Sequence, residues 1–585
     1  MVDVKGIINA RTRNNKKAKV FELTTDYKYT GLNEYPRPQM VRDSYINLNG
    51  EWDLRISSEY GSTIYEGQIL VPFSPEARLS GVGHTLLPNQ TLLYEKDIQL
   101  TKTVGKRILL HIGACDQCTY VDLNGHFIGS HEGGYTSFSF DITRASVDGL
   151  NHLQILVTDD TDKSGFARGK QKLRPGGMFY TAQSGIWQTV WIEYVDDIYI
   201  KNLTIVPDID SNEVKVTVET GALMDDVDIV FEEDIVSRIS KKEVYGGIQI
   251  TAVLDNYELW CKENPRLYSF TVKANKDKVK SYVAMRHVST KMDDKGYMRI
   301  CLNHKPIFIN GVLDQGYYPE SLMTPPSDEA MVDDIMRAFD AGFNLIRKHC
   351  KIEPMRWYYH CDRLGMLVCQ DMVNGGKKYD MKAICYMPAI YHKWKKQSDK
   401  TRFMLNATGR TNSRTVKIWK KETYETITQL RNVPSICMWT VFNEGWGQFD
   451  TRRCTKYIRS LDNTRIMDSA SGWFDQGSGD IYSDHNYFFK YEVLPDKHKR
   501  AFMISEYGGF SLQIEGHVCK NVLYGYHPCF TKEGFINDLV KTQEEIKSII
   551  QEGLAGAVFT QLTDIEEEQN GLYTYDRRVN KYKND

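Results

Sequence analysis

Apolar strand-like runs alternate with helical patterns through the second half of the chain, and this alternation constrains the fold most. The first helical pattern has a candidate cap at Ser327 and ends at Gly342. The eight predicted strands are 306–311, 343–349, 366–371, 436–442, 465–471, 481–487, 501–507 and 555–562. Eight such units in about 295 residues predict a C-terminal (β/α)8 TIM barrel.

The first half of the chain has a different pattern. Short segments such as 107–113 and 152–159 alternate apolar and polar residues, and turn residues such as Asn124-Gly125 separate them. This pattern predicts an N-terminal β jelly roll, and its continuation over about a hundred residues fits an immunoglobulin-like β-sandwich. We therefore predict a multidomain chain, divided at residues 1–196, 197–290 and 291–585.

Two predicted connections of the barrel are long. Residues 372–420 are Lys-rich and contain little pattern, whereas residues 508–532 are rich in Gly, Tyr and His. Both follow strands, so we expect both at the carboxyl end of the barrel, where the βα loops shape a ligand site. We expect the first to form a lid or rim, and the two together to determine ligand specificity.

Charge and cysteine usage exclude several classes of function. The net charge is −2, from 74 basic and 76 acidic residues, so no general field attracts nucleic acid or an anionic membrane. No run approaches the roughly 18 apolar residues of a membrane helix, and the first residues lack the apolar run of a secretory signal, so we expect a cytoplasmic protein. Only Cys115 and Cys118 have CxxC spacing, so we expect reduced structural thiols and no metal site.

Two glutamates stand at the ends of predicted buried strands. Glu444 follows the fourth strand in Asn443-Glu444-Gly445, and Glu506 ends the seventh in Ser505-Glu506-Tyr507. A carboxyl at such a position must be desolvated or paired, and in a barrel it faces the ligand site. Cleavage of a glycosidic bond needs two carboxyls, one protonated and one ionised. We predict that Glu444 and Glu506 are the catalytic pair of a glycosidase; two structural salt bridges are the alternative.

At these residues the chain resembles glycoside hydrolase family 2, the family of β-galactosidases, β-glucuronidases and β-mannosidases. The resemblance covers nearly the whole chain, and the ordered set of motifs makes it specific. The motifs are Leu48-Asn49-Gly50-Glu51-Trp52, Val71-Pro72-Phe73, Gly133-Gly134-Tyr135, Ser184-Gly185-Ile186-Trp187-Gln188, Glu263-Asn264-Pro265-Arg266-Leu267-Tyr268, Asn310-Gly311-Val312, Asn344-Leu345-Ile346-Arg347 and Asn443-Glu444-Gly445.

The resemblance implies a role for each matched residue. Glu444 resembles the general acid/base and Glu506 the nucleophile. Asn443 resembles the residue that hydrogen-bonds the sugar 2-hydroxyl. Tyr487 resembles the tyrosine that hydrogen-bonds the nucleophile, and Arg347 an arginine beside it; a core tyrosine and a structural ion pair are the alternatives.

Further residues near strand ends are weaker candidates for substrate contact, each with a structural role as the alternative: His349, Trp446, His485 and Asp314. Asp371, like Asp314, is a candidate to bind sugar hydroxyls or to brace the barrel rim, and Asp564 is a candidate to hydrogen-bond the sugar. We expect the acidic run 564–568, which includes Asp564, to be solvated.

The chain departs from the family at two places. The β-glucuronidases carry an Asn-x-Lys pair that binds the uronate, whereas the corresponding segment here is Glu568-Gln569-Asn570-Gly571. The missing cation argues against glucuronides. Many members also place a Trp at the end of strand eight, where this chain has Gln561-Leu562-Thr563.

Together these features predict a retaining β-glycosidase with carboxyls about 5–5.5 Å apart, whereas an inverting pair would lie about 6.5–9.5 Å apart. We expect a β-galactosidase-like substrate first, then a decorated β-linked glycan, a β-mannoside and last a β-glucuronide. A non-catalytic carbohydrate-binding protein and a transglycosylase are the alternatives. The mechanism implies a carbohydrate partner and no cofactor, and the resemblance allows a homo-oligomer without fixing the state.

Overall fold

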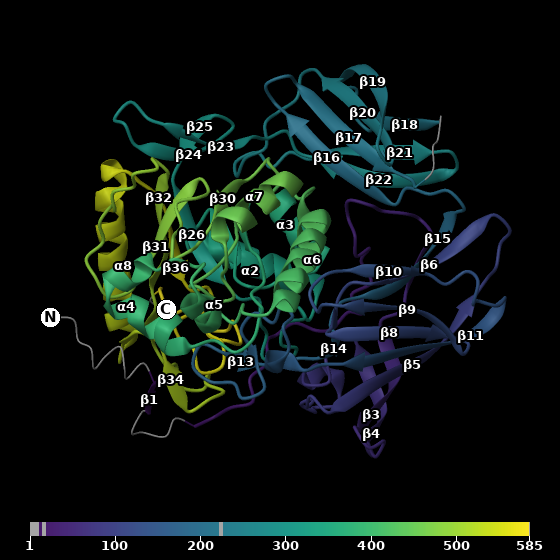
Figure 1. The fold of residues 1–585 in the computed structure, drawn as a ribbon, viewed down its shortest axis with the longest axis horizontal. Coiled ribbons are helices and arrows are strands. Elements are labelled where there is room, and N and C mark those ends of the chain that lie inside the picture. The colour runs from purple at the N-terminus through teal and green to yellow at the C-terminus, as the bar shows by residue number, and fades with distance from the viewer. Residues whose placement is uncertain (1–10, 14–18, 222–225, 584–585) are drawn as a thin grey trace.

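The computed structural model describes residues 11–13, 19–221 and 226–583. A closed barrel lies beside two stacked β-sandwiches, as the ribbon shows (Figure 1). The predicted combination of jelly roll, immunoglobulin-like sandwich and TIM barrel is confirmed. Within the described residues, no helix combines the length and the apolar character needed to cross a membrane.

The jelly roll consists of two antiparallel sheets with the strand orders β4-β3-β5-β11-β8-β9 and β10-β6-β15-β2. The predicted Asn124-Gly125 turn joins β8 to β9, and both residues have the positive φ (55° and 77°) that a two-residue hairpin requires. The strands are β2 (Tyr45–Asn47), β3 (Gly50–Ser58), β4 (Thr63–Val71), β5 (Gln90–Leu100), β6 (Lys106–Ile112), β8 (Cys118–Leu123), β9 (His126–Glu132), β10 (Phe138–Asp141), β11 (Gly149–Thr158) and β15 (Val190–Asp196). Short pairs complete this part: β1 (Arg11–Arg13), β7 (Cys115–Asp116), β12 (Gln171–Lys172), β13 (Tyr180–Thr181) and β14 (Gly185–Ile186).

The immunoglobulin-like sandwich packs the sheet β16-β17-β20-β19 against β18-β21-β22. Alternation explains its core, because Val214, Val216 and Val218 of one strand are all fully buried. The strands are β16 (Asn202–Asp208), β17 (Glu213–Glu219), β18 (Val227–Phe231), β19 (Val236–Val244), β20 (Gly247–Leu254), β21 (Tyr268–Ala274) and β22 (Asp277–Val283). We keep the domain division at residues 196 and 290 as a proposal, since a further strand, β23 (Val288–Met292), crosses residue 290.

Eight parallel strands close the barrel in chain order. They are β26 (Ile309–Asp314), β27 (Leu345–Lys348), β28 (Leu367–Asp371), β29 (Ile436–Thr440), β30 (Ile466–Asp468), β31 (Ile481–Asn486), β32 (Ala501–Gly508) and β36 (Leu554–Thr560). The helices are α2 (Asp328–Asp340), α3 (Met355–Leu364), α4 (Met387–Ile390), α5 (Arg402–Ala407), α6 (Ser413–Leu430), α7 (Thr451–Leu461) and α8 (Lys532–Ile549). The predicted cap is present, because the Ser327 side chain accepts a hydrogen bond from the Ala330 amide.

The prediction of a first barrel strand at 306–311 is partly wrong. Residues Lys305–Ile307 form β25, which pairs antiparallel with β24 (Met298–Leu302), and the barrel strand begins only at Ile309. Asn303 and His304 both have positive φ (52° and 64°), so a tight turn reverses the chain just before β25. The other seven predicted strands overlap the observed ones.

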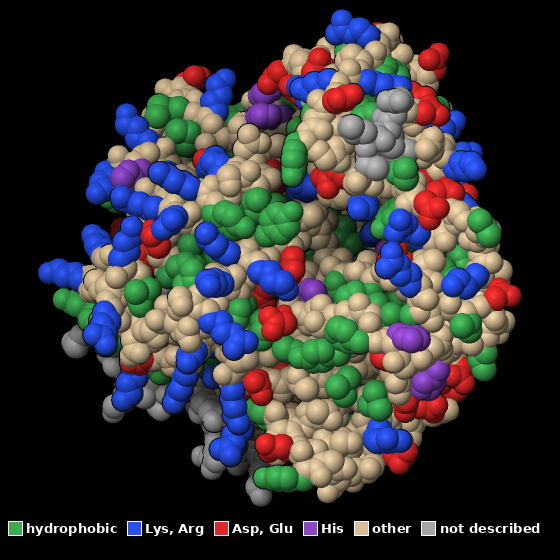
Figure 2. Space-filling view, turned by 45° about the vertical axis from the view of Figure 1, so that its right-hand side comes forward, with side chains coloured by type: hydrophobic (Ala, Val, Ile, Leu, Met, Phe, Trp, Pro, Cys, Tyr) green, Lys and Arg blue, Asp and Glu red, His purple; other side chains and the backbone are tan. Residues whose placement is uncertain are grey.

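The prediction of little pattern across 372–420 is also partly wrong. Residues Lys382–Tyr386 form a π-helical turn followed by α4, and residues 413–420 belong to α6, which is capped by Asn412. The many lysines hid the apolar face of α6, where Thr415, Ile418 and Trp419 are buried. Lys and Arg side chains gather on the left-hand half of Figure 2, the side on which the barrel lies. The segment 508–532 contains β33 (Phe510–Ser511), β34 (Val522–Tyr524) and β35 (His527–Pro528).

Candidate active site

The carboxyl ends of the barrel strands bring Glu444 and Glu506 together. Glu506 lies within β32, and Glu444 stands four residues beyond the end of β29, where its amide donates to the Ser471 carbonyl at 3.0 Å. One carboxylate oxygen of each glutamate lies within 4.8 Å of the other. Glu444 has a left-handed backbone (φ 50°), a conformation that is uncommon outside glycine and tends to persist at functional sites.

Two donors hold the Glu506 carboxylate. The Tyr487 hydroxyl donates to Oε2 at 2.6 Å, and the Arg347 guanidinium donates to Oε1 at 3.2 Å. Burial raises the pKa of Glu506, whereas Arg347 and the Tyr487 hydrogen bond act against the rise. Both donors stabilise the ionised form, which is the form that a nucleophile needs.

Glu444 has a different environment. Its Oε1 lies 2.8 Å from Nδ1 of His485. Among the described residues, no Lys or Arg side chain lies at ion-pair distance from Glu444. Burial raises the pKa of Glu444 from 4.5 to about 7, although Lys170 and Arg347 lower it from a distance. A carboxyl that titrates near neutrality is suited to donate and later accept a proton.

His485 lies between the two glutamates. Its Nδ1 is also 3.4 Å from Glu506 Oε2, and its Nε2 is 3.0 Å from the Ser471 hydroxyl. Burial lowers the pKa of His485 to about 4, so the ring is neutral at pH 7. The Ser471 hydroxyl also donates to Ser505 Oγ at 2.8 Å, and the tautomer of the His485 ring decides which of its two nitrogens donates.

Arg347 ties several predicted residues to the pair. Its Nε and Nη2 each donate to one carboxylate oxygen of Asp371 at 3.0 Å. Nη2 also donates to the Asn443 side-chain oxygen at 2.7 Å. The amide nitrogen of Asn443 is thereby oriented away from Arg347. Asp371, the last residue of β28, braces the arginine, and His349 Nδ1 lies 2.9 Å from the same carboxylate.

Two other predicted contacts lie outside the cavity. Asp314, the last residue of β26, forms a buried ion pair with Lys348, which also meets Glu353 at 2.8 Å. Trp446 is 1 % exposed, and the Phe179 ring stacks on it with centroids 5.7 Å apart. In this structure Asp314 therefore braces the rim, and Trp446 packs under Phe179 instead of forming an open platform.

A cavity of about 340 Å³ borders Glu444. His485 and Tyr487 also line it, whereas Glu506 does not line it and is hydrogen-bonded to Tyr487. Its walls include Met381, Cys385 and Tyr386 of the segment 372–420, Tyr524 and Tyr526 of the segment 508–532, and Lys172 with residues 174–179 of the jelly roll. Both long connections thus border the candidate site, together with a loop from another part of the chain.

The expectation of a solvated run at 564–568 is wrong. Glu566, Glu567 and Glu568 are all buried, because they fasten the jelly-roll loop to the barrel. Glu566 accepts from the Thr181 amide at 2.9 Å, Glu567 from the Gly177 amide at 2.7 Å, and Glu568 from the Tyr180 hydroxyl. Asp564 does not reach the cavity and pairs with Lys581 at 2.6 Å.

The jelly roll also contributes to the site, which the sequence patterns did not predict. Lys170 approaches the Trp446 ring from above (6.0 Å) and pairs with Glu568 at 3.7 Å, and Lys172 and Arg174 line the cavity. A signal was available, because these three cations alternate with other residues in an extended segment shortly before the motif at 184–188. Its distance in sequence from the barrel hid its importance.

Two groups of side chains in the described part of the chain have the spacing of metal ligands: His349, Cys350 and Asp371, and Glu444, His485 and Glu506. Arg347 already neutralises Asp371 and contacts Glu506. A fixed guanidinium at this position disfavours a divalent cation in either group.

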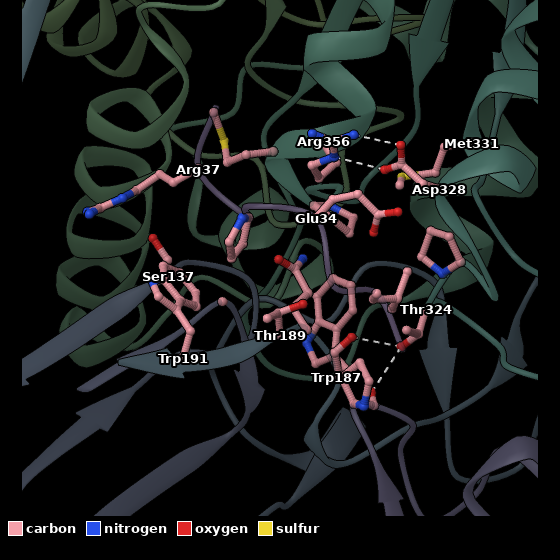
Figure 3. Close-up of a pocket in the computed structure, with 18 of the residues that line it drawn as sticks. Glu34, Arg37, Ser137, Trp187, Thr189, Trp191, Thr324, Asp328, Met331 and Arg356 are labelled. Atoms are coloured by element: carbon pink, nitrogen blue, oxygen red, sulfur yellow. Dashed lines mark hydrogen bonds and ion pairs between the residues drawn. The ribbon is translucent and has the colours of Figure 1, made fainter. Parts of the chain in front are cut away.

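A smaller cavity of about 50 Å³ lies between the jelly roll and the barrel (Figure 3). Its wall includes Trp187 and Trp191 on one side, and on the other Asp328, which forms a two-pronged ion pair with Arg356 (2.6 and 2.8 Å). None of the predicted site residues lines it. We interpret it as a packing space between domains.

Comparison with known proteins agrees with this geometry. Residues 294–581 match the family model described as glycosyl hydrolases family 2, TIM barrel domain. The chain is 23 % identical over 428 residues to a β-galactosidase of Thermoanaerobacter pseudethanolicus. The matched region covers 69 % of this chain and 52 % of that protein. The chain therefore spans about half the length of this relative.

Two solved structures resemble the whole chain in fold. A β-D-glucuronidase from Dictyoglomus thermophilum superimposes with a TM-score of 0.72 at 16 % identity, over 94 % of this chain and 97 % of that one. A β-galacturonidase from Eisenbergiella tayi bound to galacturonate superimposes with a TM-score of 0.68 at 17 % identity, over 94 % of this chain and 97 % of that one. The match of residues 294–581 identifies the barrel as a TIM barrel domain of glycoside hydrolase family 2, and the chain shares its overall architecture with these two structures.

Proposed function

We propose that this chain is a retaining β-glycosidase. Glu506 attacks the anomeric carbon while the protonated Glu444 donates its proton to the leaving oxygen, so the glycosidic bond breaks and a glycosyl ester of Glu506 forms. Glu444, now ionised, takes a proton from water, and the water oxygen displaces Glu506. The sugar leaves with its configuration retained after two inversions.

The observation that carries this proposal is the pairing of two carboxyls within 4.8 Å in unlike environments. The short separation supports retention, because an inverting pair must leave room for a water molecule. The donors on Glu506 support its role as nucleophile, and the raised pKa of Glu444 supports its role as acid.

A β-galactoside is the first substrate to test, because the named relatives include β-galactosidases at 21–25 % identity. Structural neighbours with other names share only the fold at 16–17 % identity. A panel of chromogenic β-galactoside, β-glucuronide, β-galacturonide, β-mannoside and α-arabinoside would identify the glycosyl unit. If the protein cleaves none of these substrates, that result counts against the proposed function.

Substitution of the nucleophile gives the decisive variant. Glu506→Ala should lose roughly 10⁴-fold or more in kcat, since removal of a nucleophile abolishes the covalent route. Azide should partly restore activity and give the glycosyl azide of inverted configuration, because it attacks from the vacated face. In Glu444→Ala azide should give the retained product instead. The same product configuration from both variants would contradict the assignment.

A further inference from the structure

The outer wall of the cavity carries cations that have no carboxylate partner. Lys170 is paired with Glu568, but neither Lys172 nor Arg174 has a carboxylate at ion-pair distance within the described residues. Lys172 Nζ instead lies 3.5 Å above the Phe179 ring. Both cations line the same cavity as Glu444.

The position of Lys172 is electrostatically unfavourable without a ligand. Burial lowers the pKa of Lys172; the charge of Asp162 acts against this, and the positive charges of Arg168 and Lys378 add to it. A half-buried cation among other cations is stabilised most by an anion placed against it. The cation–π contact with Phe179 offsets only part of that cost.

The loop that presents these cations is fixed to the barrel. The Gly177 and Thr181 amides donate to Glu567 and Glu566, and the Gly176 and Phe179 backbones pair with each other. The cations therefore stand at one edge of the cavity in a defined position relative to Glu444. A binding group held in this way is preorganised, which lowers the entropy lost on binding.

The rest of the cavity wall is suited to a sugar. The rings of Trp473, Tyr487, Tyr524 and Tyr526 line it. Aromatic faces combined with a few fixed polar groups are typical of sites that hold a small organic ligand, and about 340 Å³ is within the usual range. Aromatic walls for the ring and two free cations for a substituent together select an anionic sugar.

We propose that this cavity binds an acidic glycan, whose carboxylate or sulfate group is held by Lys172 and Arg174. The inference rests on the proposed glycosidase function and adds the substrate class. Glu444, which must reach the leaving oxygen, lines the cavity, whereas Glu506 does not. Because the acid and not the nucleophile borders the cavity, we place the anion on the leaving part of the substrate.

Matched disaccharides test this proposal. The glycosyl unit found with the chromogenic panel is linked to glucose, to glucuronic acid or to glucose 6-sulfate, which separates a carboxylate from a sulfate. We expect kcat/KM at least about tenfold higher for one charged disaccharide than for the neutral one, mainly through KM. The preference should fall at high salt, because the cations are partly exposed.

Charge-neutralising variants show which side chains cause the preference for the charged disaccharide. Lys172→Gln and Arg174→Gln should each remove most of the preference, which is the ratio of kcat/KM for the charged to the neutral disaccharide measured in the same variant. Lys378→Gln is the control, since Lys378 is exposed nearby but does not line the cavity. The corresponding uronide with a neutral aryl leaving group forms a further arm: a preference there that depends on Lys172 would place the anion on the cleaved sugar.

Two outcomes would overturn the proposal. One is equal kcat/KM for neutral and charged substrates, and the other is a preference for charge that survives in both Gln variants. Turnover of the neutral disaccharide in the same assay shows that the glycosidase function holds even if the charge preference fails. Titration calorimetry of Glu506→Ala with glucuronic acid, galacturonic acid and their neutral counterparts measures binding independently of turnover.

Discussion

The floor of the candidate site (Arg347, Asp371, Tyr487 and Glu506) and its outer wall (Lys172 and Arg174) differ in how their charges are balanced. On the floor, Glu506 has Arg347 and Tyr487, and Arg347 has Asp371. On the wall, Lys172 and Arg174 face the cavity without an ion pair in the described structure. A network that is complete before substrate arrives can orient reacting groups, whereas unpaired charges are available to bind a ligand.

The two regions also come from different parts of the fold. Barrel strands carry the floor, and strand ends hold side chains more precisely than loops do. A jelly-roll loop carries the wall, fastened by acceptors on Glu566, Glu567 and Glu568. We therefore expect floor substitutions to change kcat and wall substitutions to change KM and selectivity.

The largest effect after loss of the nucleophile is expected at Tyr487. Tyr487→Phe removes the 2.6 Å hydrogen bond to Glu506 and should lower kcat/KM by roughly 10²–10³-fold, as loss of a preorganised donor does. The acid limb of the pH–rate profile should also move to higher pH, because the hydrogen bond lowers the pKa of Glu506.

Tyr526→Phe is the matched control for that variant. The centroid of its ring lies 4.2 Å from that of the Tyr487 ring, and no hydrogen bond joins its hydroxyl to either glutamate among the described residues. A comparable loss in both variants would mean that ring packing, and not the bond to Glu506, is what matters.

Titration of Glu444 gives the next prediction. Since the acid must be protonated and its pKa is about 7, kcat/KM for a poor leaving group should fall as pH rises through about 7. Glu444→Gln should abolish this limb. A limb that persists in Glu444→Gln would assign it to another group.

The same shift predicts an effect on stability. The folded pKa of about 7 exceeds the unfolded value of 4.5, so the carboxyl favours the fold below pH 4.5 and loses that contribution as pH rises to 7. At pH 8 the neutral Gln should raise the free energy of unfolding by up to about 3 kcal/mol. Denaturant unfolding at pH 4 and pH 8 measures this, with little gain expected at pH 4.

The barrel and its pair of glutamates could be predicted because they depend on local patterns. Apolar runs of strand length identify the barrel, and an acid at the end of such a run is costly unless it has a function. The first strand was misplaced by three residues because the apolar run 306–309 continues from β25 into β26, and the two strands pair with different partners. Pairing across the chain is not visible in a local pattern.

The wall could not be predicted for a related reason. The acidic run 564–568 has the composition of a solvated surface, and only docking of residues 177–181 buries it. Trp446 likewise depends on Phe179, which is 267 residues away in sequence. Contacts between separate domains determine these environments, and a single sequence contains no periodicity that reports them.

The smallest expected effect tests whether the fastening of the wall matters. Glu567→Ala removes the acceptor of the Gly177 amide, whereas Glu567→Gln keeps an oxygen at the same place. Loosening the loop should raise KM for the charged disaccharide about threefold and leave kcat nearly unchanged, because the floor does not depend on this bond. The Gln variant should resemble the parent chain. If the Ala variant lowers kcat for the neutral disaccharide as well, then the wall also positions the reacting groups, and the division between floor and wall is wrong.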